Sequence, residues 1–287
     1  MRRTGLVLAA AAALVLVGAG CGGGSSSGSG GITIAPARTY RLTAFRPAVP
    51  VPAGKPTVVA FTITKPNGRP LTDYRRGPGP HTGVHLIMVR HDLSAIVHVH
   101  PPVGAGGRIR ETVVFPAPGP YRVVVDAYPA STTAGLTNFQ LFHELTVSGT
   151  YRPKPLPPVT REVVADGYRF TLHPHPPLHA IDPEFLTVTV RDPAGRPAEF
   201  TPWYGALAHA IFFRKGSLDY FHTHVCSAGA VGCTSVLGTT KITGSSTTPG
   251  KLTVGVLVPV SGLWRLFLQC KVDGRILTAP FTLPVAG

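Results

Sequence analysis

A repeated histidine pattern constrains this chain more than any other feature of its sequence. Each copy has the form H-x12-H-x-H, with an arginine five residues after the first histidine. The histidines of the two copies are His85, His98 and His100, and His209, His222 and His224. A chain that repeats a spaced pattern of this length is expected to fold twice into the same local structure.

The repetition extends well beyond the histidines, and its order is kept along the chain. The matched segments are 40–43 with 168–171, 66–70 with 193–197, 116–122 with 259–265 and 145–149 with 283–287. The sequence therefore predicts two tandem domains, at 34–150 and 160–287. A proline-rich stretch at 151–159 is expected to connect them as a semi-rigid linker.

The composition of both repeats favours β-structure. The chain has 33 glycines and 30 prolines, and its apolar stretches are short, alternating and rich in Val, Thr and Phe. In the first repeat we expect strands near 40–46, 57–64, 84–90, 96–100, 109–115, 120–128 and 139–147. Seven short strands in a domain of this size predict an all-β fold, an immunoglobulin-like or cupredoxin-like β-sandwich. The sequence does not choose between these two topologies.

The N-terminus has the features of an export signal. Residues 1–20 join a charged start to an apolar run that is short for a membrane span, and Cys21 follows as in a bacterial lipobox. Residues 21–33 form a Gly/Ser-rich tether. We therefore expect lipidation of Cys21 and anchoring in the outer leaflet of the cytoplasmic membrane, with the protein outside the cytoplasm. An ordinary secretory peptide, with Cys21 incidental, is the alternative.

The chain is strongly basic, with 27 Lys and Arg against 13 Asp and Glu. The basic residues are scattered and no aromatic-basic motif accompanies them, so nucleic acid is not an expected partner. Attraction to anionic lipid or cell wall is a simpler explanation of the charge.

Strand geometry predicts that the histidines of each copy converge. Because side chains alternate along a strand, His98 and His100 should share one face, while Val97 and Val99 enter the core. Hairpins centred on 91–92 and 215–216 would set His85 opposite His98, and likewise His209 opposite His222. Three neutral imidazoles suit Cu(II) or Zn, so we predict one such ion in each repeat. The alternative is that these histidines only pack the sheets.

Three cysteines lie in the second copy, and an oxidising compartment predicts one disulfide and one remaining thiol. The pairings Cys226–Cys233, Cys226–Cys270 and Cys233–Cys270 are all open. A structural bridge is favoured over a thiolate ligand beside the second histidine set. Six further histidines are weaker candidates: His81 and His91 as auxiliary ligands, His143 with no evident role, and His173, His175 and His179 in a proline-rich loop.

The segments 85–101, 115–122 and 203–224 resemble those of a bacterial family of exported two-repeat proteins with His-x-His motifs. The resemblance covers the chain from about residue 40 to its end, and it implies an association with copper or heavy-metal handling. Two departures are Cys226 in the segment after the second His-x-His, where proline is common, and Cys270, where an aromatic residue is common.

These features lead to a functional prediction. We expect an extracytoplasmic lipoprotein that binds copper or zinc for sequestration or delivery, with a metal-exchange protein as a candidate partner. No catalytic motif is present, so an enzyme is not expected, and a copper-dependent oxidase or reductase is the weakest interpretation. The main alternative is a structural or adhesive cell-surface β-sandwich protein without metal.

Overall fold

The structure is a computed structural model, and it describes residues 40–76, 79–80, 82–130, 138–230, 232–233, 236–237 and 240–287. The predicted signal peptide, Cys21 and the tether lie outside the described residues. The described chain is all-β, as predicted, with a single 3-10 turn, η1 (Ala105–Gly107). Within it, no helix has the length and apolar character needed to cross a bilayer.

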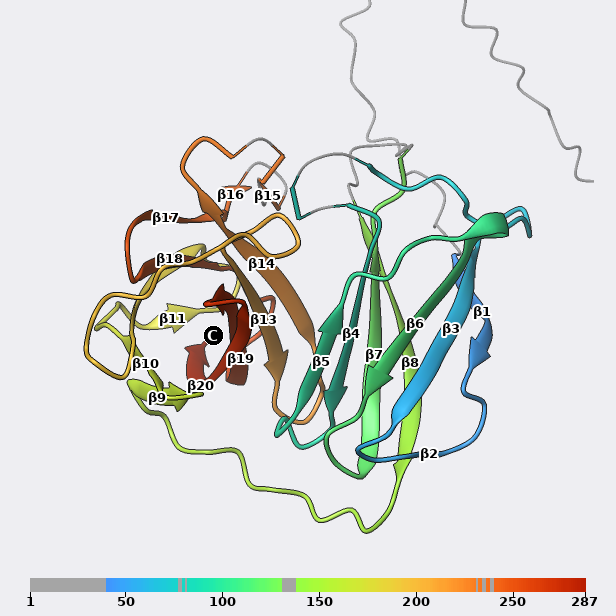
Figure 1. Ribbon diagram of the computed structural model, residues 1–287, viewed down its shortest axis with the longest axis horizontal. Coiled ribbons are helices and arrows are strands. Elements are labelled where there is room, and N and C mark those ends of the chain that lie inside the picture. Colours follow the sequence, from blue (N-terminus) through green and yellow to red (C-terminus); the bar gives the residue numbers. More distant parts are fainter. Residues whose placement is uncertain are drawn as a thin grey trace, which may run out of the picture. The chain divides into compact units, whose positions relative to one another are not determined.

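The first repeat is a sandwich of two sheets, drawn in blue to green in Figure 1. Its strands are β1 (Arg41–Arg46), β2 (Val51–Pro52), β3 (Pro56–Thr64), β4 (Val84–Arg90), β5 (Ile96–Val99), β6 (Arg108–Val114), β7 (Gly119–Ala127) and β8 (Phe139–Ser148). One sheet has the order β1-β3-β6 and the other has the order β2-β8-β7-β4-β5. The seven strands expected from sequence are confirmed, and the short edge strand β2 is an addition.

The second repeat has the same strand order within one continuous sheet of ten strands. Its strands are β9 (Glu162–Ala165), β10 (Tyr168–Leu172), β11 (Leu178–His179), β12 (Glu184–Arg191), β13 (Ala208–Arg214), β14 (Tyr220–Ser227), β17 (Gly244–Thr248), β18 (Lys251–Val256), β19 (Gly262–Val272) and β20 (Arg275–Ala286). The run β11-β20-β19-β13-β14 matches β2-β8-β7-β4-β5, and β18-β12-β10 matches β6-β3-β1.

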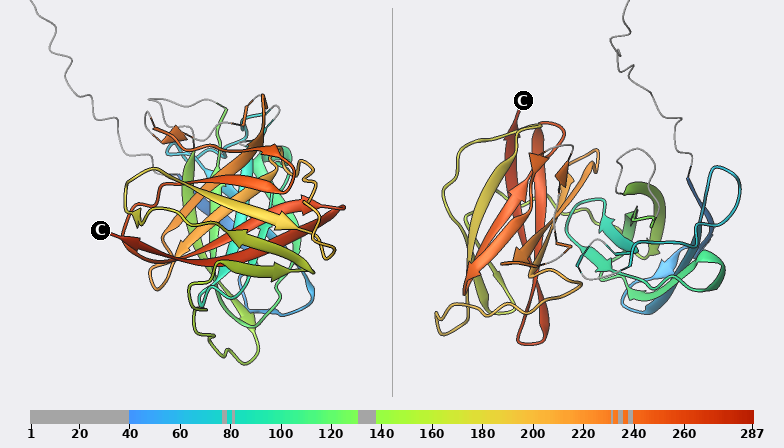
Figure 2. Two further views of the ribbon diagram at one scale, coloured as in Figure 1. Left: turned by 90° about the vertical axis from the view of Figure 1, so that its left-hand side faces the viewer. Right: turned by 90° about the horizontal axis from the view of Figure 1, so that it is seen from above.

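An insertion after β14 explains why the second repeat has a single sheet. Strand β17 from this insertion pairs with β14 on one side and with β18 on the other, so it bridges the two layers. Figure 2 shows the ten-stranded sheet, in yellow to red, curling into two layers. The insertion also carries a small separate hairpin of β15 (Val236–Leu237) and β16 (Thr240–Lys241).

Two features identify the sandwiches as immunoglobulin-like. The strand orders are those of an immunoglobulin-type domain, and a corner bond closes the loop before the penultimate strand. In the first repeat the Tyr121 hydroxyl donates to the carbonyl oxygen of Ala117 at 3.0 Å. In the second repeat the Trp264 indole N–H donates to the carbonyl oxygen of Val260, also at 3.0 Å. The same corner is thus built with a different aromatic residue.

Each repeat has its own apolar core between its two layers. In β4 the residues that enter this core are Leu86 and Met88, and in β13 they are Ala208, Ala210 and Phe212. Val97 and Val99 pack against the first core, as predicted. The alternation of strand side chains sends the intervening residues of β4 and β13 to the opposite face of the sheet.

That opposite face is also buried, because the two repeats pack against each other there. The described residues from 40 onward belong to one compact unit. A third apolar cluster joins the repeats, formed by Ile87, Val89, Leu93 and Val124 of the first and Ile211, Phe213, Leu218 and Phe267 of the second. Complete burial of such a side chain contributes about 1.5–3 kcal/mol. The β4 and β13 sheets are therefore covered on both faces.

The linker takes part in this contact. Leu156 packs against the apolar cluster between the repeats. The Lys154 backbone N–H donates to Asp92 Oδ2 at 2.8 Å, and the Thr282 hydroxyl donates to the carbonyl oxygen of Pro157 at 2.8 Å. Asp92 belongs to the first repeat and Thr282 to the second, so the linker is fastened to both.

The hairpins that carry the histidines differ from the predicted register. His98 lies opposite Ile87 and His222 opposite Ile211, while His209 faces His224. The predicted pairing was wrong because the connecting loops are longer than a tight turn: the Arg90 N–H donates to the Ala95 oxygen at 3.0 Å. A register shift of two residues leaves each side chain on its original face, so the histidines still share one face.

Candidate metal centre

The six repeated histidines lie on the sheet face that joins the two repeats. Strands β4 and β13 carry the first histidine of each set, and β5 and β14 with their immediate continuation carry the rest. His85, His209 and His224 are fully buried, and His98 is only 6% exposed. An isolated immunoglobulin-like domain would expose this face to water. The burial of these polar rings therefore comes from the other repeat.

The rings form a single cluster that crosses from one repeat to the other. Within repeats, the ring centres of His85 and His100 are 4.0 Å apart, and those of His222 and His224 are 4.4 Å apart. Between repeats, His85 is 4.9 Å from His222. The predicted arrangement of two separate three-histidine sites is corrected here, because the outer faces of the two sheets meet.

Three overlapping groups of histidines have donor atoms that all lie within 4.8 Å of one another. They are His85, His98 and His100; His85, His222 and His224; and His98, His209 and His222. Only the first group matches a predicted set, and the other two mix the repeats. Any two of these groups share one histidine, so filling two at once would need one imidazole to serve two ions. Among the described residues, the geometry therefore fits one ion.

Three of the rings are oriented by hydrogen bonds to oxygen atoms. His85 Nε2 donates to the Pro80 carbonyl at 2.7 Å, and His209 Nε2 donates to the Trp203 carbonyl at 3.0 Å. His98 Nδ1 donates to Gln269 Oε1 at 3.0 Å. In a neutral imidazole the other nitrogen then carries a lone pair. Metal-binding histidines are held in this way in most protein metal sites.

His222 lies between two of these lone pairs. Its Nδ1 is 3.1 Å from His85 Nδ1, and its Nε2 is 3.4 Å from His209 Nδ1. A neutral imidazole has one N–H, so His222 can donate to only one of them. At the other contact two lone pairs face each other unless a proton or a metal ion lies between the two nitrogens. Nitrogens around a tetrahedral ion with bonds of 2.0–2.1 Å are about 3.3 Å apart, which is close to these separations.

The environment favours the neutral form of the three histidines from the first repeat. Burial lowers the pKa of His85 from 6.5 to about 4, against a smaller opposing effect of the Pro80 hydrogen bond. Burial also lowers the pKa of His98 well below its ordinary value, and the nearby rings of His209 and His85 lower it further. The pKa of His100 is lowered for the same two reasons. Neutral rings are the form that binds metal.

Asp126 and Gln269 belong to this centre, and sequence reasoning missed both. They occupy equivalent positions on β7 and β19, where Asp126 pairs with His85 and Gln269 pairs with His209. A polar residue within an otherwise apolar strand, at the same place in both repeats, was the available signal. Asp126 Oδ2 lies 3.8 Å from His85 Nδ1, so a carboxylate adjoins the donor nitrogens.

Hydrogen bonds from both repeats hold the Asp126 carboxylate. Tyr128 of the first repeat and Tyr220 of the second each donate a hydroxyl hydrogen to Oδ2 at 3.3 Å. Asn138 donates to Oδ1 at 2.7 Å. Burial raises the pKa of both tyrosines well above 10, and the Asp126 charge raises it further. Both phenols therefore stay protonated and serve as donors to a buried negative charge.

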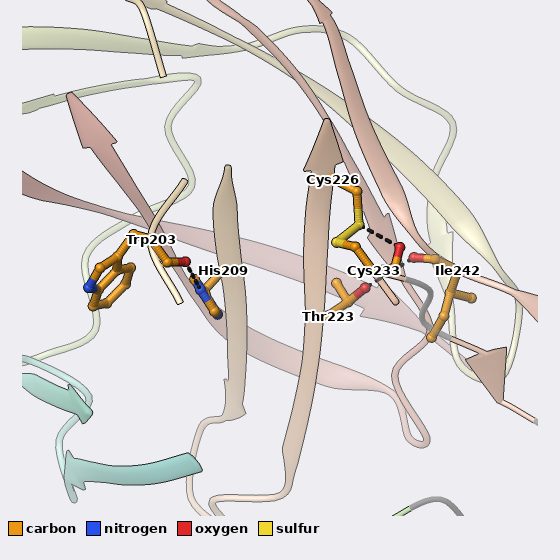
Figure 3. The surroundings of a disulfide bond; sticks show 6 residues. All are labelled: Trp203, His209, Thr223, Cys226, Cys233 and Ile242. Atoms are coloured by element: carbon orange, nitrogen blue, oxygen red, sulfur yellow. Dashed lines mark hydrogen bonds between the residues drawn. A yellow bond between two sulfur atoms is a disulfide. The ribbon is translucent and has the colours of Figure 1, made fainter. Parts of the chain in front are cut away.

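Trp203 and Tyr204 border the cluster from the second repeat. The Tyr204 ring stacks on His100 with 3.9 Å between the ring centres. The Trp203 backbone supplies the oxygen that orients His209, as Figure 3 shows. This segment precedes β13. Its sequence resembles a family motif, but it gave no sign of a role beside the histidines.

None of the three cysteines belongs to a candidate donor group among the described residues. Cys226 and Cys233 form a disulfide at the end of β14 (Figure 3), which selects one of the three open pairings. Cys270 is a buried thiol in the second core, and burial raises its pKa to about 12. It follows Gln269 on β19, so alternation directs it to the face opposite the histidines.

The remaining described histidines lie outside the cluster. His81 is not among the described residues. His91 Nε2 is 2.7 Å from Glu144 Oε2 in an ion pair on the surface. His143 packs on Phe45, with 3.9 Å between the ring centres. His173 contacts the Thr189 hydroxyl at 3.1 Å. His179 is exposed on β11, so these side chains do not extend the donor set.

Several solved structures show distant likeness to the chain. Invasin, a bacterial integrin-binding protein, has 15% identity and a TM-score of 0.24, with coverage of 88% of this chain and 40% of invasin. The fibronectin(III)-like modules of Clostridium thermocellum CbhA have 11% identity and a TM-score of 0.22, with coverage of 86% and 93%. Domains 5–6 of the S-layer protein SbsC have 11% identity and a TM-score of 0.22, with coverage of 87% and 99%. Likeness at this level carries no functional argument.

No curated protein matches the chain. A family model does match, over two segments that coincide with the two repeats, at residues 40–150 and 162–287. Because these segments cover most of the sequence, the chain belongs to the family described as Domain of unknown function (DUF8832).

Proposed function

We propose that this protein binds one Cu(II) or Zn(II) ion in the histidine cluster shared by its two repeats. The observation that carries the proposal is the orientation of His85, His98 and His209. Each ring donates one N–H to an oxygen and turns its second nitrogen toward another histidine of the cluster. A set of neutral nitrogen donors at these separations matches the coordination that both ions prefer.

The composition of the cluster favours these ions over others. Calcium and magnesium need several oxygen ligands, and Asp126 is the one carboxylate found here among the described residues. A thioether would favour Cu(I), but Met88 points into the first core. Asp126 would supply either an oxygen ligand or a nearby negative charge that partly offsets the charge of a divalent ion.

The proposed role is metal sequestration or delivery outside the cytoplasm. It rests on the export signal, on Cys21 as a lipid anchor in the outer leaflet of the cytoplasmic membrane, and on the absence of any recognisable catalytic motif in the sequence. A metal-exchange protein is the partner that such a role requires. Binding rather than catalysis is proposed, since no cysteine thiolate that could tune a redox metal belongs to the candidate donor groups of the described residues.

Metal analysis combined with calorimetry tests the proposal. The purified protein should be stripped with a chelator, titrated separately with Cu(II) and Zn(II), and then analysed for bound metal after desalting. The expected result is about one tightly bound ion per chain. If the wild type and a variant with alanine at His85, His98, His209 and His222 retain equal amounts of metal, the proposal is wrong.

A structural or adhesive protein without metal is the second candidate. It is favoured by the position of the rings within the contact between the repeats, beside the apolar cluster of Ile87, Val124, Ile211 and Phe267. On this alternative the histidines only fill that contact. The quadruple alanine variant would then lose stability, while the wild-type protein would bind neither ion and would not be stabilised by either one.

A further inference from the structure

A pocket of about 410 Å³ opens beside the histidine cluster. Its lining includes Tyr74, Arg75, Arg76, Thr82 and His100 of the first repeat and Tyr204 of the second. The volume is at the lower end of the range for small-molecule sites, about 300–1,000 Å³. The pocket can therefore hold a small organic molecule or a hydrated ion.

The described lining of this pocket is rich in hydrogen-bond donors and contains no acidic side chain. Arg75 and Arg76 take part in none of the ion pairs found among the described residues.

The arginines are held in place by the backbone around them. The Arg75 N–H donates to the Tyr128 oxygen at 2.8 Å, and the Gly83 N–H donates to the Arg75 oxygen at 3.0 Å. Tyr74 forms a β-bridge with Pro129. The backbone at Tyr74 and Arg75 is thus held by hydrogen bonds to neighbouring segments of the first repeat.

His100 belongs both to the pocket lining and to the histidine cluster. Its Nε2 lies 3.1 Å from His98 Nε2, and its ring stacks on Tyr204. It is the one member of the six-histidine cluster among the described residues that line the pocket. A molecule in the pocket therefore adjoins the cluster at His100.

From the arginine pair, the lack of acidic side chains in the described lining and the presence of His100, we infer that this pocket binds a small anion carrying carboxylate or phosphate oxygens. Two guanidinium groups bind such oxygens through charge-assisted hydrogen bonds. The inference deepens the proposed function, because it places an anionic ligand next to the proposed ion, but the anion site is formed by residues outside the donor set.

Calorimetric titration of the metal-free protein with citrate and, separately, with inorganic phosphate tests this inference. Saturable binding of either probe is expected, and the comparison tells carboxylate from phosphate. Arg75→Gln with Arg76→Gln should weaken binding at least about tenfold, because two charge-assisted hydrogen-bonding groups are lost. The matched control is Arg110→Gln, an exposed arginine on β6, which should change nothing.

Metal-free protein keeps this test independent of the metal proposal. Absence of saturable binding by both probes would overturn the inference, even if zinc binds normally. Equal affinities in the wild type and in the folded double arginine variant would overturn it as well. Binding of an anion that depends on these residues would support it, even if the protein binds no metal.

Discussion

His85 and His222 belong to different repeats, and yet their Nδ1 atoms lie 3.1 Å apart. Because the two donors come from different repeats, one repeat alone could not bring them together. Two of the three candidate ligand groups contain histidines from both repeats, and both of these groups include His222. A metal ion bound there would join the two sandwiches directly.

Alanine substitutions in the two repeats should therefore have the same effect. His85→Ala and His222→Ala are each expected to weaken binding of the single ion by a similar factor, because each removes a donor shared by two of the three groups. Zinc bound per chain, measured after desalting, checks this. The control is His179→Ala, an exposed histidine on β11. If each variant keeps half of the wild-type metal, the repeats bind independently and the shared site is wrong.

Gln269 should matter for metal affinity although it is not in the candidate donor set. Gln269→Leu removes the oxygen that accepts from His98 Nδ1, so the ring loses its orientation. Loss of such a supporting bond costs about 10–100-fold in affinity. Gln269→Glu keeps an acceptor oxygen and should retain most of the affinity. Competition against a chelator of known affinity measures the difference, and equal losses in both variants would contradict the positioning role.

Acid should destabilise the metal-free protein through the histidine cluster. The folded pKa of His85 is about 4, below the ordinary 6.5. Between pH 6.5 and 4, His85 is protonated in the unfolded chain and neutral in the folded chain. The free energy of unfolding therefore falls as the pH drops through this range. His85 alone corresponds to about 3 kcal/mol over this window, and His98 and His100 act in the same direction.

Urea denaturation at pH 7, 5.5 and 4.5 measures this pH dependence. His85→Gln should make the free energy of unfolding less dependent on pH, since it removes one group with a lowered pKa. A free energy of unfolding in the wild type that is constant over this range, or that rises toward acid, would show that the rings are not buried in neutral form.

Thiol chemistry should separate Cys270 from the other cysteines of the second repeat. A thiol-specific reagent should react with no cysteine of the folded second repeat and with one cysteine of that repeat after denaturation. The reason is that Cys270 is buried and the other two cysteines are joined in a disulfide. Cys270→Ala should leave zinc affinity unchanged, since this thiol faces the core. Loss of zinc binding in that variant would place the thiolate among the ligands.

Cys21→Ser should move the protein from the membrane fraction to the soluble extracytoplasmic fraction. The expectation follows from the apolar segment before Cys21 and the Gly/Ser tether after it. Detergent phase partitioning of the two forms provides the measurement. An unchanged distribution would exclude the lipid anchor, without bearing on the metal site.

The sequence by itself determined the strands and the repetition. The short apolar run from Leu86 to Val89 predicts a strand. Spacing puts His98 and His100 on one face of the next strand, because a strand has a period of two residues. The aligned segments around Tyr121 and Trp264 likewise predict one fold twice. The predicted register was wrong, but the predicted face of each histidine was still correct, since a two-residue shift leaves every side chain on the same side of the sheet.

Only the tertiary structure decided what that face meets. The unbroken apolar run from Leu86 to Val89 was the one local sign that β4 is covered on both sides, and it does not name the covering partner. The meeting of His85 with His222, and of His98 with Gln269, depends on how two separate sandwiches pack. Such contacts join residues far apart in sequence, so no periodicity along the chain encodes them. The same packing selected one shared cluster in place of two separate sites.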